Sequence, residues 1–346
     1  MLKRLSARER FEQLVATWSS PIRAAFMEAI DDIRSNIVLR RIVECLERGD
    51  IAGAIRAMNL DEAAFRPLED ALRQTFTGGG VAAVEGMPAL RDPDGHRLVI
   101  RFDVRNPAAE TWLREHSATL VTNIVEDQRT VIRTALEEGL ARGDNPTRTA
   151  LDVIGRLNRA TGRREGGVVG LTTAQGEYVA RARQELLSGE PDQLRNYLSR
   201  GRRDKRFDRT ITSALRDGKP IPKEMVDRIV GRYSDGLLKL RADTIALNET
   251  MEALSTSKDI AFRQRIENGD LQAQHVTKTW KHTPQEHPRV QHVEMQGQTV
   301  RLDESFRAPD GTAIPYPHAP GVPLRHKLGC KCFAEYKIDF AARLVS

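Results

Sequence analysis

The sequence predicts a predominantly α-helical α+β protein, with long N-terminal and central helices and a small, loop-rich α+β module at the C-terminus. Over much of the chain before residue 270, apolar residues recur at spacings of three and four, the period of a helix. Charged residues make up 29% of the chain against 40% apolar, which favours solvated helices over one thick core. Residues 275–332 differ, because six of the eight histidines and two of the three cysteines lie there and helical signals are few.

Length and composition limit the class of protein. At 346 residues, two or three domains are expected. No apolar run approaches the roughly 20 residues of a transmembrane helix, so we expect no membrane anchor. The first ten residues are highly charged with no apolar region behind them, so we expect no secretory signal. Three cysteines, two of them separated by a single residue, indicate a reducing compartment rather than a disulfide framework.

Residues 1–90 are predicted to form an N-terminal helical domain. Pro21 can open a helix at its first turn, and apolar residues follow it at helical spacing. Two shorter helices are expected at about Ile51–Met58 and Leu60–Phe76. Gly78-Gly79-Gly80 should then break the helical pattern, and we place the first domain boundary in the loop expected to follow.

Residues 91–240 are predicted to form a central, mostly helical domain with one strand and a basic insertion. The strand is Leu98–Val104, where apolar residues alternate with charged ones at positions 97, 101, 103 and 105. Asn106-Pro107 and Asn145-Pro146 each supply an N-cap and a first helical residue. The other expected elements are a helix containing Trp112, a second helix from about Ala118 to Arg142 that ends at Gly143, a loop at 160–168, and two or three helices that carry the basic insertion.

Residues 241–346 are predicted to form the C-terminal module. The helix that leads into it has apolar residues at alternating steps of three and four, which predicts a narrow heptad seam: Leu237, Leu240, Thr244, Leu247, Met251 and Leu254. Short strands are expected at Gln298–Leu302 and Phe333–Ile338.

A cluster of histidines and cysteines is the candidate metal site. In an extended backbone, Cys330 and Cys332 project both sulfurs to one face. Thiolate and imidazole are ligands of tetrahedral zinc, so the candidate ligands are His292, His326, Cys330 and Cys332, with His282 as an alternative to His292. The same residues could instead be buried groups that pack a small domain, since zinc sites usually contain Cys-x2-Cys pairs. No cofactor other than structural zinc is expected.

Catalytic signals are weak. A nucleophilic Cys330 or Cys332 would need a cation or helix N-terminus to lower its pKa. Asp303 and Glu304 are adjacent, so in a strand they point to opposite faces and cannot act jointly on one bond. The chain has no GxxxxGK[ST] loop, no GxGxxG after a strand and no HExxH. We therefore expect that the protein is not an enzyme.

Basic residues are concentrated in one segment, which we call the basic segment. Residues 195–209 hold seven basic residues against two acidic ones, a net charge of +5 in a chain whose total is +6. The seven are Arg195, Arg200, Arg202, Arg203, Lys205, Arg206 and Arg209. They are candidates for binding a polyanion, with strong salt dependence if they contact phosphates. A solvated helix face, or a contact with an acidic protein surface, is the alternative.

Four segments of the last hundred residues follow one another in a characteristic order. They are Ile245–Ala253 with Glu249 at its centre; Trp280 followed by Thr283, Arg289, His292, Gly297 and Val300; Leu302-Asp303-Glu304-Ser305-Phe306 followed by Asp310-Gly311; and Pro320-Gly321 followed by Gly329-Cys330-Lys331-Cys332. In order and spacing, these segments resemble the phage Mu F-like head morphogenesis family, the minor head proteins. Leu247 and Asn248 stand where that family usually has Arg and Thr, and Gly329 replaces its usual Asn.

The resemblance implies a structural role in a virion. Members of that family are present in few copies, associate with the portal vertex of the head and matter for head assembly and for the packaged or ejected DNA. By this resemblance, the chain is expected to be a minor capsid protein that contacts the portal protein and a capsid or scaffold protein through residues 1–90. Its basic segment is expected to contact DNA or an acidic partner. A hydrolase or transferase that uses the His/Cys cluster, and a stand-alone DNA-binding protein, are the alternatives.

Overall fold

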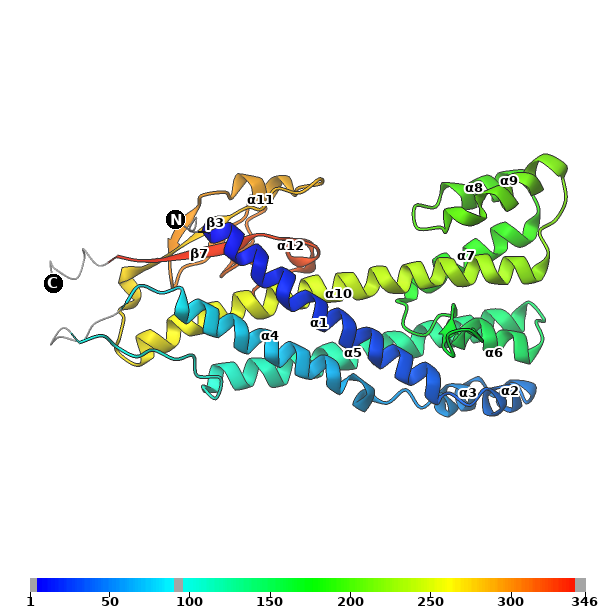
Figure 1. Ribbon diagram of the computed structural model, residues 1–346, viewed down its shortest axis with the longest axis horizontal. Coiled ribbons are helices and arrows are strands. Elements are labelled where there is room, and N and C mark those ends of the chain that lie inside the picture. Colours follow the sequence, from blue (N-terminus) through cyan, green and yellow to red (C-terminus); the bar gives the residue numbers. More distant parts are fainter. Residues whose placement is uncertain (1–4, 90–95, 340–346) are drawn as a thin grey trace. The chain divides into compact units, whose positions relative to one another are not determined.

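The computed structural model of this chain describes residues 5–89 and 96–339. It is 64% helical with a few small antiparallel sheets, which confirms the predicted predominantly helical α+β class (Figure 1). The chain forms two compact units: unit 1 consists of Met1–Ala24, Leu68–Ser117 and Thr244–Ser346, and unit 2 consists of Ala25–Pro67 and Ala118–Asp243. Neither unit is continuous in sequence, so this division differs from the contiguous segments 1–90, 91–240 and 241–346 expected from the sequence.

Unit 2 contains parts of three long helices together with shorter helices and strands. The long helices, which contribute residues to both units, are α1 (Ala7–Asn36), α5 (Pro107–Ala141) and α10 (Lys223–Glu267). The elements that lie wholly in unit 2 are α2 (Leu39–Glu47), α3 (Ile51–Ala57), the 3-10 helix η1 (Glu62–Phe65), α6 (Pro146–Ile154), β1 (Arg156–Leu157), β2 (Arg164–Glu165), α7 (Thr173–Ser188), α8 (Pro191–Ser199), the 3-10 helix η2 (Lys205–Phe207) and α9 (Asp208–Asp217).

Local capping chemistry fixes the helix starts that the sequence predicted. Asn106 and Asn145 accept hydrogen bonds from the backbone N–H groups of Ala108 (3.0 Å) and Thr147 (2.8 Å), and α5 and α6 begin at the prolines that follow. The two helices expected between residues 107 and 142 are one continuous helix, α5, so the predicted break near residue 118 is wrong.

The prediction that a helix begins at Pro21 is also wrong. Helix α1 begins at Ala7 and contains Pro21 in its interior. An interior proline removes one backbone hydrogen bond and costs roughly 3 kcal/mol. Burial of the apolar face offsets this cost, since Ile22, Phe26 and Ile30 of α1 are completely buried.

A buried loop without regular structure lies at the centre of unit 2. Residues 166–171 follow the small antiparallel hairpin β1–β2, which occupies part of the predicted loop 160–168. Side chains of three long helices satisfy the polar backbone atoms of this loop. Arg34 of α1 donates to Val169 O (2.6 Å), and Gln128 of α5 both donates to Leu171 O (3.0 Å) and accepts from Gly170 N (2.5 Å). From α10, Arg241 donates to Gly170 O (3.1 Å) and Ser234 donates to Gly167 O. Asp235 of α10 accepts from Gly166 N (2.8 Å). Without these partners, each buried group would lose a hydrogen bond to water without replacing it.

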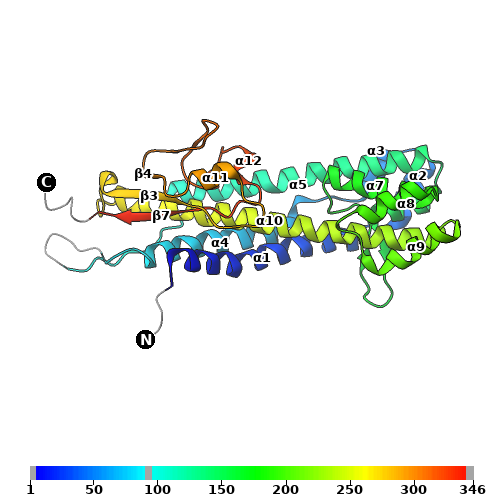
Figure 2. The same cartoon turned by 90° about the horizontal axis from the view of Figure 1, so that it is seen from above.

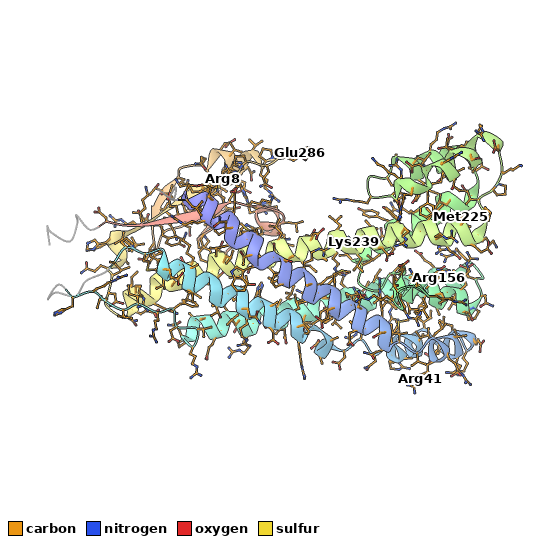
Figure 3. All side chains as sticks on the ribbon, viewed as in Figure 1. Arg8, Arg41, Arg156, Met225, Lys239 and Glu286 are labelled. Atoms are coloured by element: carbon orange, nitrogen blue, oxygen red, sulfur yellow. The ribbon has the colours of Figure 1, made fainter. Side chains whose placement is uncertain are left out.

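A network of arginines and aspartates joins α6, β1, α7 and α10 within unit 2. Arg183 bonds both Asp227 (2.5 Å) and Asp152 (2.9 Å). Arg156, labelled in Figure 3, reaches the same two carboxylates, and Arg148 bonds Asp227 as well. Burial opposes the charge on Asp227, but the hydrogen bond from Arg183 and the charges of Arg156 and Arg148 outweigh it and lower the pKa of this carboxyl.

Unit 1 combines long helical segments with a small sheet. Besides its parts of α1, α5 and α10, it contains α4 (Arg66–Glu85), the 3-10 helix η3 (Ala273–His275), β3 (Val276–Lys281), α11 (Val290–Glu294), β4 (Thr299–Arg301), β5 (Phe306–Arg307), β6 (Ala313–Ile314), α12 (Leu324–Lys327) and β7 (Phe333–Ile338). β3 is central in an antiparallel sheet of order β4-β3-β7, and β3 and β7 lie side by side in both views (Figures 1 and 2). The strands predicted at Gln298–Leu302 and Phe333–Ile338 are confirmed as β4 and β7.

Helix α10 forms the core of unit 1. From Thr250 to Phe262, every residue except Lys258 is buried. The predicted narrow heptad seam is wrong, because burial along α10 is not confined to it. Leu238, Ala242 and Ala246 lie off the seam and are buried, whereas Leu240, Thr244 and Leu247 lie on it and are only half-buried. The N-terminal part of α1 covers one side of α10: Phe11, Met251, Leu254 and Phe333 form one hydrophobic cluster. In it, Phe11 stacks on Phe333 of β7 at a centroid distance of 4.8 Å.

The helix break predicted at Gly78-Gly79-Gly80 does not occur, because α4 continues to Glu85. These glycines sit where three other parts of unit 1 approach the helix backbone. An added Cβ would come within 2.2 Å of Trp18 at Gly78, 2.5 Å of Ser257 at Gly79 and 2.4 Å of Phe102 at Gly80. Glycine is selected here by close packing rather than by a turn.

The strand predicted at Leu98–Val104 is also absent: within residues 96–105, Arg97 alone makes a β-bridge. The predicted alternation of burial is present, with Leu98, Ile100, Phe102 and Val104 half-buried and the residues between them exposed. Side chains of α10 take the place of a neighbouring strand. Gln264 accepts from Asp103 N (3.0 Å) and donates to Asp103 O (2.6 Å), while Arg265 donates to Arg101 O (3.3 Å).

We expect Gln128→Ala to destabilise the protein strongly, because it leaves Gly170 N and Leu171 O buried without partners. Each such group costs about 1–3 kcal/mol, so the free energy of unfolding measured in urea should fall by about 2 kcal/mol or more. Gln193→Ala, at an exposed position of α8, is the control and should change stability little. Equal stability of the two variants would contradict the role assigned to Gln128.

Candidate metal centre and basic segment

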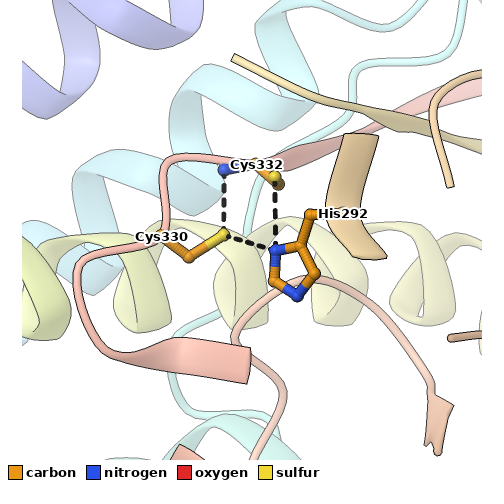
Figure 4. A group of neighbouring side chains, drawn as sticks. All are labelled: His292, Cys330 and Cys332. Atoms are coloured by element: carbon orange, nitrogen blue, oxygen red, sulfur yellow. Dashed lines mark hydrogen bonds between the residues drawn. The ribbon is translucent and has the colours of Figure 1, made fainter. Parts of the chain in front are cut away.

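Two cysteines and one histidine converge in the C-terminal part of unit 1 (Figure 4). His292 lies on α11, and its Nδ1 is 3.3 Å from Cys330 Sγ and 3.7 Å from Cys332 Sγ. The backbone N–H of Cys332 donates to Cys330 Sγ at 3.3 Å. All three side chains are buried, and both thiols are free. The structure thus brings together three of the four residues that the sequence proposed as metal ligands.

The local backbone explains why both sulfurs face His292. Gly329 has a φ of +69°, a conformation that glycine adopts without strain, and it turns the chain between α12 and β7. Its N–H donates to Asn248 Oδ1 of α10 at 2.8 Å, which fixes the turn. The chain then runs into β7, so that Cys330 and Cys332 point inward while Lys331 is exposed.

Aromatic rings hold His292 in place from the other side. Trp280 of β3 contacts His292 edge-to-face at a centroid distance of 5.2 Å, and it contacts Phe306 in the same manner at 5.4 Å. The ring of His326 stacks on His292 at 5.4 Å. The position of His292 is therefore set by packing on two sides.

His326, the fourth predicted ligand, lies one hydrogen bond further from the sulfurs. Its Nδ1 is 3.1 Å from His292 Nε2, and its Nε2 is 3.0 Å from Asp310 Oδ2. Hydrogen bonds from the backbone N–H and hydroxyl of Thr312, together with Arg325 and His326, hold the pKa of Asp310 well below its usual range. Both nitrogens of His326 are thus occupied by partners other than the thiols.

Two further histidines lie beside the sulfurs. His282 Nδ1 is 3.6 Å from Cys332 Sγ. His318 is 2% exposed and has a φ of +65°, and neither of its ring nitrogens makes a hydrogen bond of ordinary geometry in the described structure. The sequence analysis noted His282 but attached no role to His318, since a single histidine in a proline-rich loop has no diagnostic spacing.

The pKa values of the two thiols shift in opposite directions because each thiol interacts with the other. Interactions with the neighbouring Cys332, His292 and His318 lower the pKa of Cys330 despite its burial. The hydrogen bond to Cys330 and burial raise the pKa of Cys332. In the absence of a cation, the pair therefore favours one thiolate over two.

Other residues of the resemblance make structural contacts. Arg289 donates to Leu328 O, and Gly297, with a φ of +83°, donates to Trp280 O at 3.0 Å. Asp303 and Glu304 are exposed and have different partners: Arg263 lies 3.7 Å from Asp303, and Glu304 accepts from Arg301 N at 2.9 Å. Gly321 also has a positive φ, of +76°.

Glu249 belongs to an ionic cluster that the sequence did not predict. Its Oε2 is 2.6 Å from His116 Nε2, and His116 Nδ1 is 3.4 Å from Glu252, which in turn pairs with Lys327. Trp112 stacks on His116 at 4.5 Å. His116 and Glu249 are 133 residues apart, so no local pattern could have linked them.

The basic segment lies in unit 2, and four of its seven cations already have partners. Arg200 bonds Glu185 through two nitrogens and stacks on Tyr233, and Arg203 bonds Asp208 through two nitrogens. The other two pairs are Arg195 with Asp192 and Arg206 with Asp204. Arg202, Lys205 and Arg209 are exposed and have no ion pair among the described residues. Only these three are free to meet a polyanion without breaking an existing pair.

Comparisons with family models, curated proteins and solved structures found no match to this chain. None of the described helices combines the length and apolar character needed to cross a bilayer. Family and function therefore remain proposals that stand on the residues themselves.

The His116 cluster should make stability depend on pH. Burial lowers the pKa of His116, but the hydrogen bond and charge of Glu249, with the charge of Glu252, outweigh burial and Lys327 and raise it. This contribution is complete below the unfolded pKa of about 6.5 and is lost as pH rises through the folded value. We expect His116→Gln to lower the free energy of unfolding by about 1.5–3 kcal/mol near pH 6, and by less at pH 9.

Urea unfolding over a pH series measures this difference. His287→Gln, at an exposed position, is the control and should leave the pH profile unchanged. A His116→Gln effect of the same size at every pH would argue against a charged His116.

Proposed function

We propose that this protein is a phage minor capsid protein, with a structural role in head assembly at the portal vertex. The observation that carries the proposal is that the residues on which the resemblance rests lie together in unit 1. They are spread over residues 249–332, yet they lie in one unit, where several of them build a core and its turns. Trp280, His292, Phe306, Cys330 and Cys332 belong to connected buried contacts, and Gly297 and Gly321 have positive φ values in turns.

Two departures from the family pattern support this proposal because they compensate each other. Asn248 stands where the family usually has Thr, and Gly329 where it usually has Asn. In this chain, Asn248 Oδ1 accepts the hydrogen bond of Gly329 N. A polar side chain at one of the two positions thus anchors the turn that presents Cys330.

An enzyme acting through the His/Cys cluster is less well supported than a structural role. The side chains of His292, Cys330 and Cys332 are at most 1% exposed. A nucleophile must reach its substrate, and reactive thiols lie in partly exposed positions. Because all three side chains are buried, a role in stabilising the fold is favoured over a role in catalysis.

In the proposed assembly, residues 1–90 contact the portal protein and a capsid or scaffold protein, in several copies around the portal ring. The basic segment contacts packaged DNA or an acidic partner through Arg202, Lys205 and Arg209. No cofactor other than structural zinc takes part in this function, and the protein belongs to the head of the virion.

Purified particles of the phage that encodes this chain should contain the protein at a copy number tied to the portal ring. Quantitative mass spectrometry against the portal protein measures this ratio. Failure to detect the chain in mature particles, or a copy number matching the major capsid protein, would contradict the proposal.

The exposed cations should account for any binding of DNA. We expect the triple change Arg202→Glu, Lys205→Glu and Arg209→Glu to weaken retention on DNA and to reduce the slope of log K against log salt by about 3, since each phosphate contact contributes about 0.9. The control reverses three exposed arginines elsewhere in unit 2, Arg41, Arg129 and Arg133, and so changes the net charge equally. If both triple variants lose retention equally, binding reflects overall charge and not the basic segment.

A further inference from the structure

Nδ1 of His292 faces the two sulfurs, and a chain of hydrogen bonds from Asp310 determines that this nitrogen carries no proton. An ionised carboxylate only accepts hydrogen bonds, so His326 Nε2 carries the proton that bonds Asp310. In a neutral His326, Nδ1 then accepts, and His292 Nε2 must donate to it. A neutral His292 is left with a bare lone pair on Nδ1, directed at Cys330 and Cys332. This is the arrangement in which imidazole binds a metal, with its other nitrogen held by an outer partner.

The three donor atoms have the spacing of ligands around one ion. In a tetrahedral zinc site, bonds of about 2.3 Å to sulfur and about 2.0–2.1 Å to nitrogen place N and S about 3.6 Å apart. The distances from His292 Nδ1 to the two sulfurs are 3.3 and 3.7 Å, and all three atoms lie within 4.8 Å of one another. No rearrangement of the backbone is needed for these three donors to share an ion.

His318 is the candidate for the fourth donor. Its ring nitrogens lie outside the group of three donors that are within 4.8 Å of one another, so it would join the ion by a movement of its side chain. It is 2% exposed, it is close enough to Cys330 to lower the pKa of that thiol, and neither of its ring nitrogens has a hydrogen-bond partner among the described residues. An unpartnered buried imidazole costs free energy that a bond to a metal would recover. Its φ of +65° is also unusual for a residue with a Cβ, which indicates that its position is imposed by the surroundings. His282 is the competitor, but it is only half-buried and contacts Cys332 alone at 3.6 Å.

We propose that Cys330, Cys332, His292 and His318 bind one Zn²⁺ in a closed tetrahedral site that stabilises the C-terminal part of unit 1. Two sulfurs and two imidazoles favour zinc over harder cations. Four buried protein ligands leave no position for substrate, so the site is structural. His326 and Asp310 are positioning residues, which orient His292 without touching the ion. This inference concerns the fold and does not depend on the proposed role in a virion.

The surrounding core explains why such a site is useful. The hydrophobic cluster that includes both cysteines has two branched aliphatic members, Ile314 and Val322; the rest are aromatic, alanine, methionine or cysteine. The strands β4, β5 and β6 are two or three residues long, so they contribute few backbone hydrogen bonds. A small module of this kind gains from a metal that links α11, the loop at residue 318 and the start of β7.

Metal analysis of the full-length protein, purified without a histidine tag, tests the proposal. We expect one zinc per chain by mass spectrometry of the released metal. Replacement by Co²⁺ should give the visible bands of tetrahedral cobalt and a thiolate-to-cobalt charge-transfer band. Removal of the metal with a chelator should lower the melting temperature, and added Zn²⁺ should restore it. Metal-free protein that binds neither Zn²⁺ nor Co²⁺, or whose melting temperature ignores them, overturns the proposal.

Single substitutions identify the ligands. Cys330→Ser, Cys332→Ser and His318→Asn should each lose the tetrahedral cobalt spectrum, whereas the exposed control His287→Asn should retain it. His326→Asn should keep the spectrum but weaken zinc binding about 10- to 100-fold, as expected of a positioning residue. If a ligand variant fails to fold, titrating chelator-treated wild-type protein with Co²⁺ still tests for two thiolates. Loss of the spectrum in His282→Asn but not in His318→Asn would overturn the assignment of His318.

Discussion

Both units depend on helix side chains that bond backbone segments lacking regular structure. A buried N–H or C=O must find a partner, and outside a helix or sheet side chains often supply it. In unit 2, Gln128 and the arginines of α1 and α10 perform this task for residues 166–171. In unit 1, Gln264 and Arg265 of α10 do so for Asp103 and Arg101. These polar side chains are as necessary to the fold as the apolar core around them, because the long helices could not otherwise pack against irregular chain.

The Cys/His centre follows the same logic at a smaller scale. Asn248 of α10 holds the turn at Gly329, that turn presents the two cysteines, and the outer chain of Asp310 and His326 orients His292. The two sulfurs and the imidazole of His292 are thus placed by hydrogen bonds to different elements, α10 for the turn and α12 for the imidazole. The site is therefore a product of the tertiary structure of unit 1, even though two of its residues are separated by one position in the sequence.

The sequence predicted those features that local chemistry determines. Asn106 and Asn145 start helices because an N-cap acts on residues two positions away, and the Cys-x-Cys spacing placed both sulfurs on one side because a near-extended chain repeats every two residues. The sequence failed where distant contacts decide. Gly78-Gly79-Gly80 looked like a break, but it is a surface on which three neighbours pack closely. Residues 98–104 alternate like a strand, but α10 lies where a second strand would be needed. No local sequence pattern indicated a role for His116 or His318, because the environment of each side chain is formed by residues that are distant in the sequence.

The stack of Phe11 on Phe333 joins two segments of unit 1 that are more than three hundred residues apart in the sequence. During synthesis, Phe11 is made more than three hundred residues before Phe333. Until then, Phe11 lacks one of its native partners, although Met251 and Leu254 of the same cluster are already present. The native core of this unit is therefore completed only once residue 333 has been made, and removal of Phe11 or Phe333 would expose the apolar residues Met251 and Leu254 of α10.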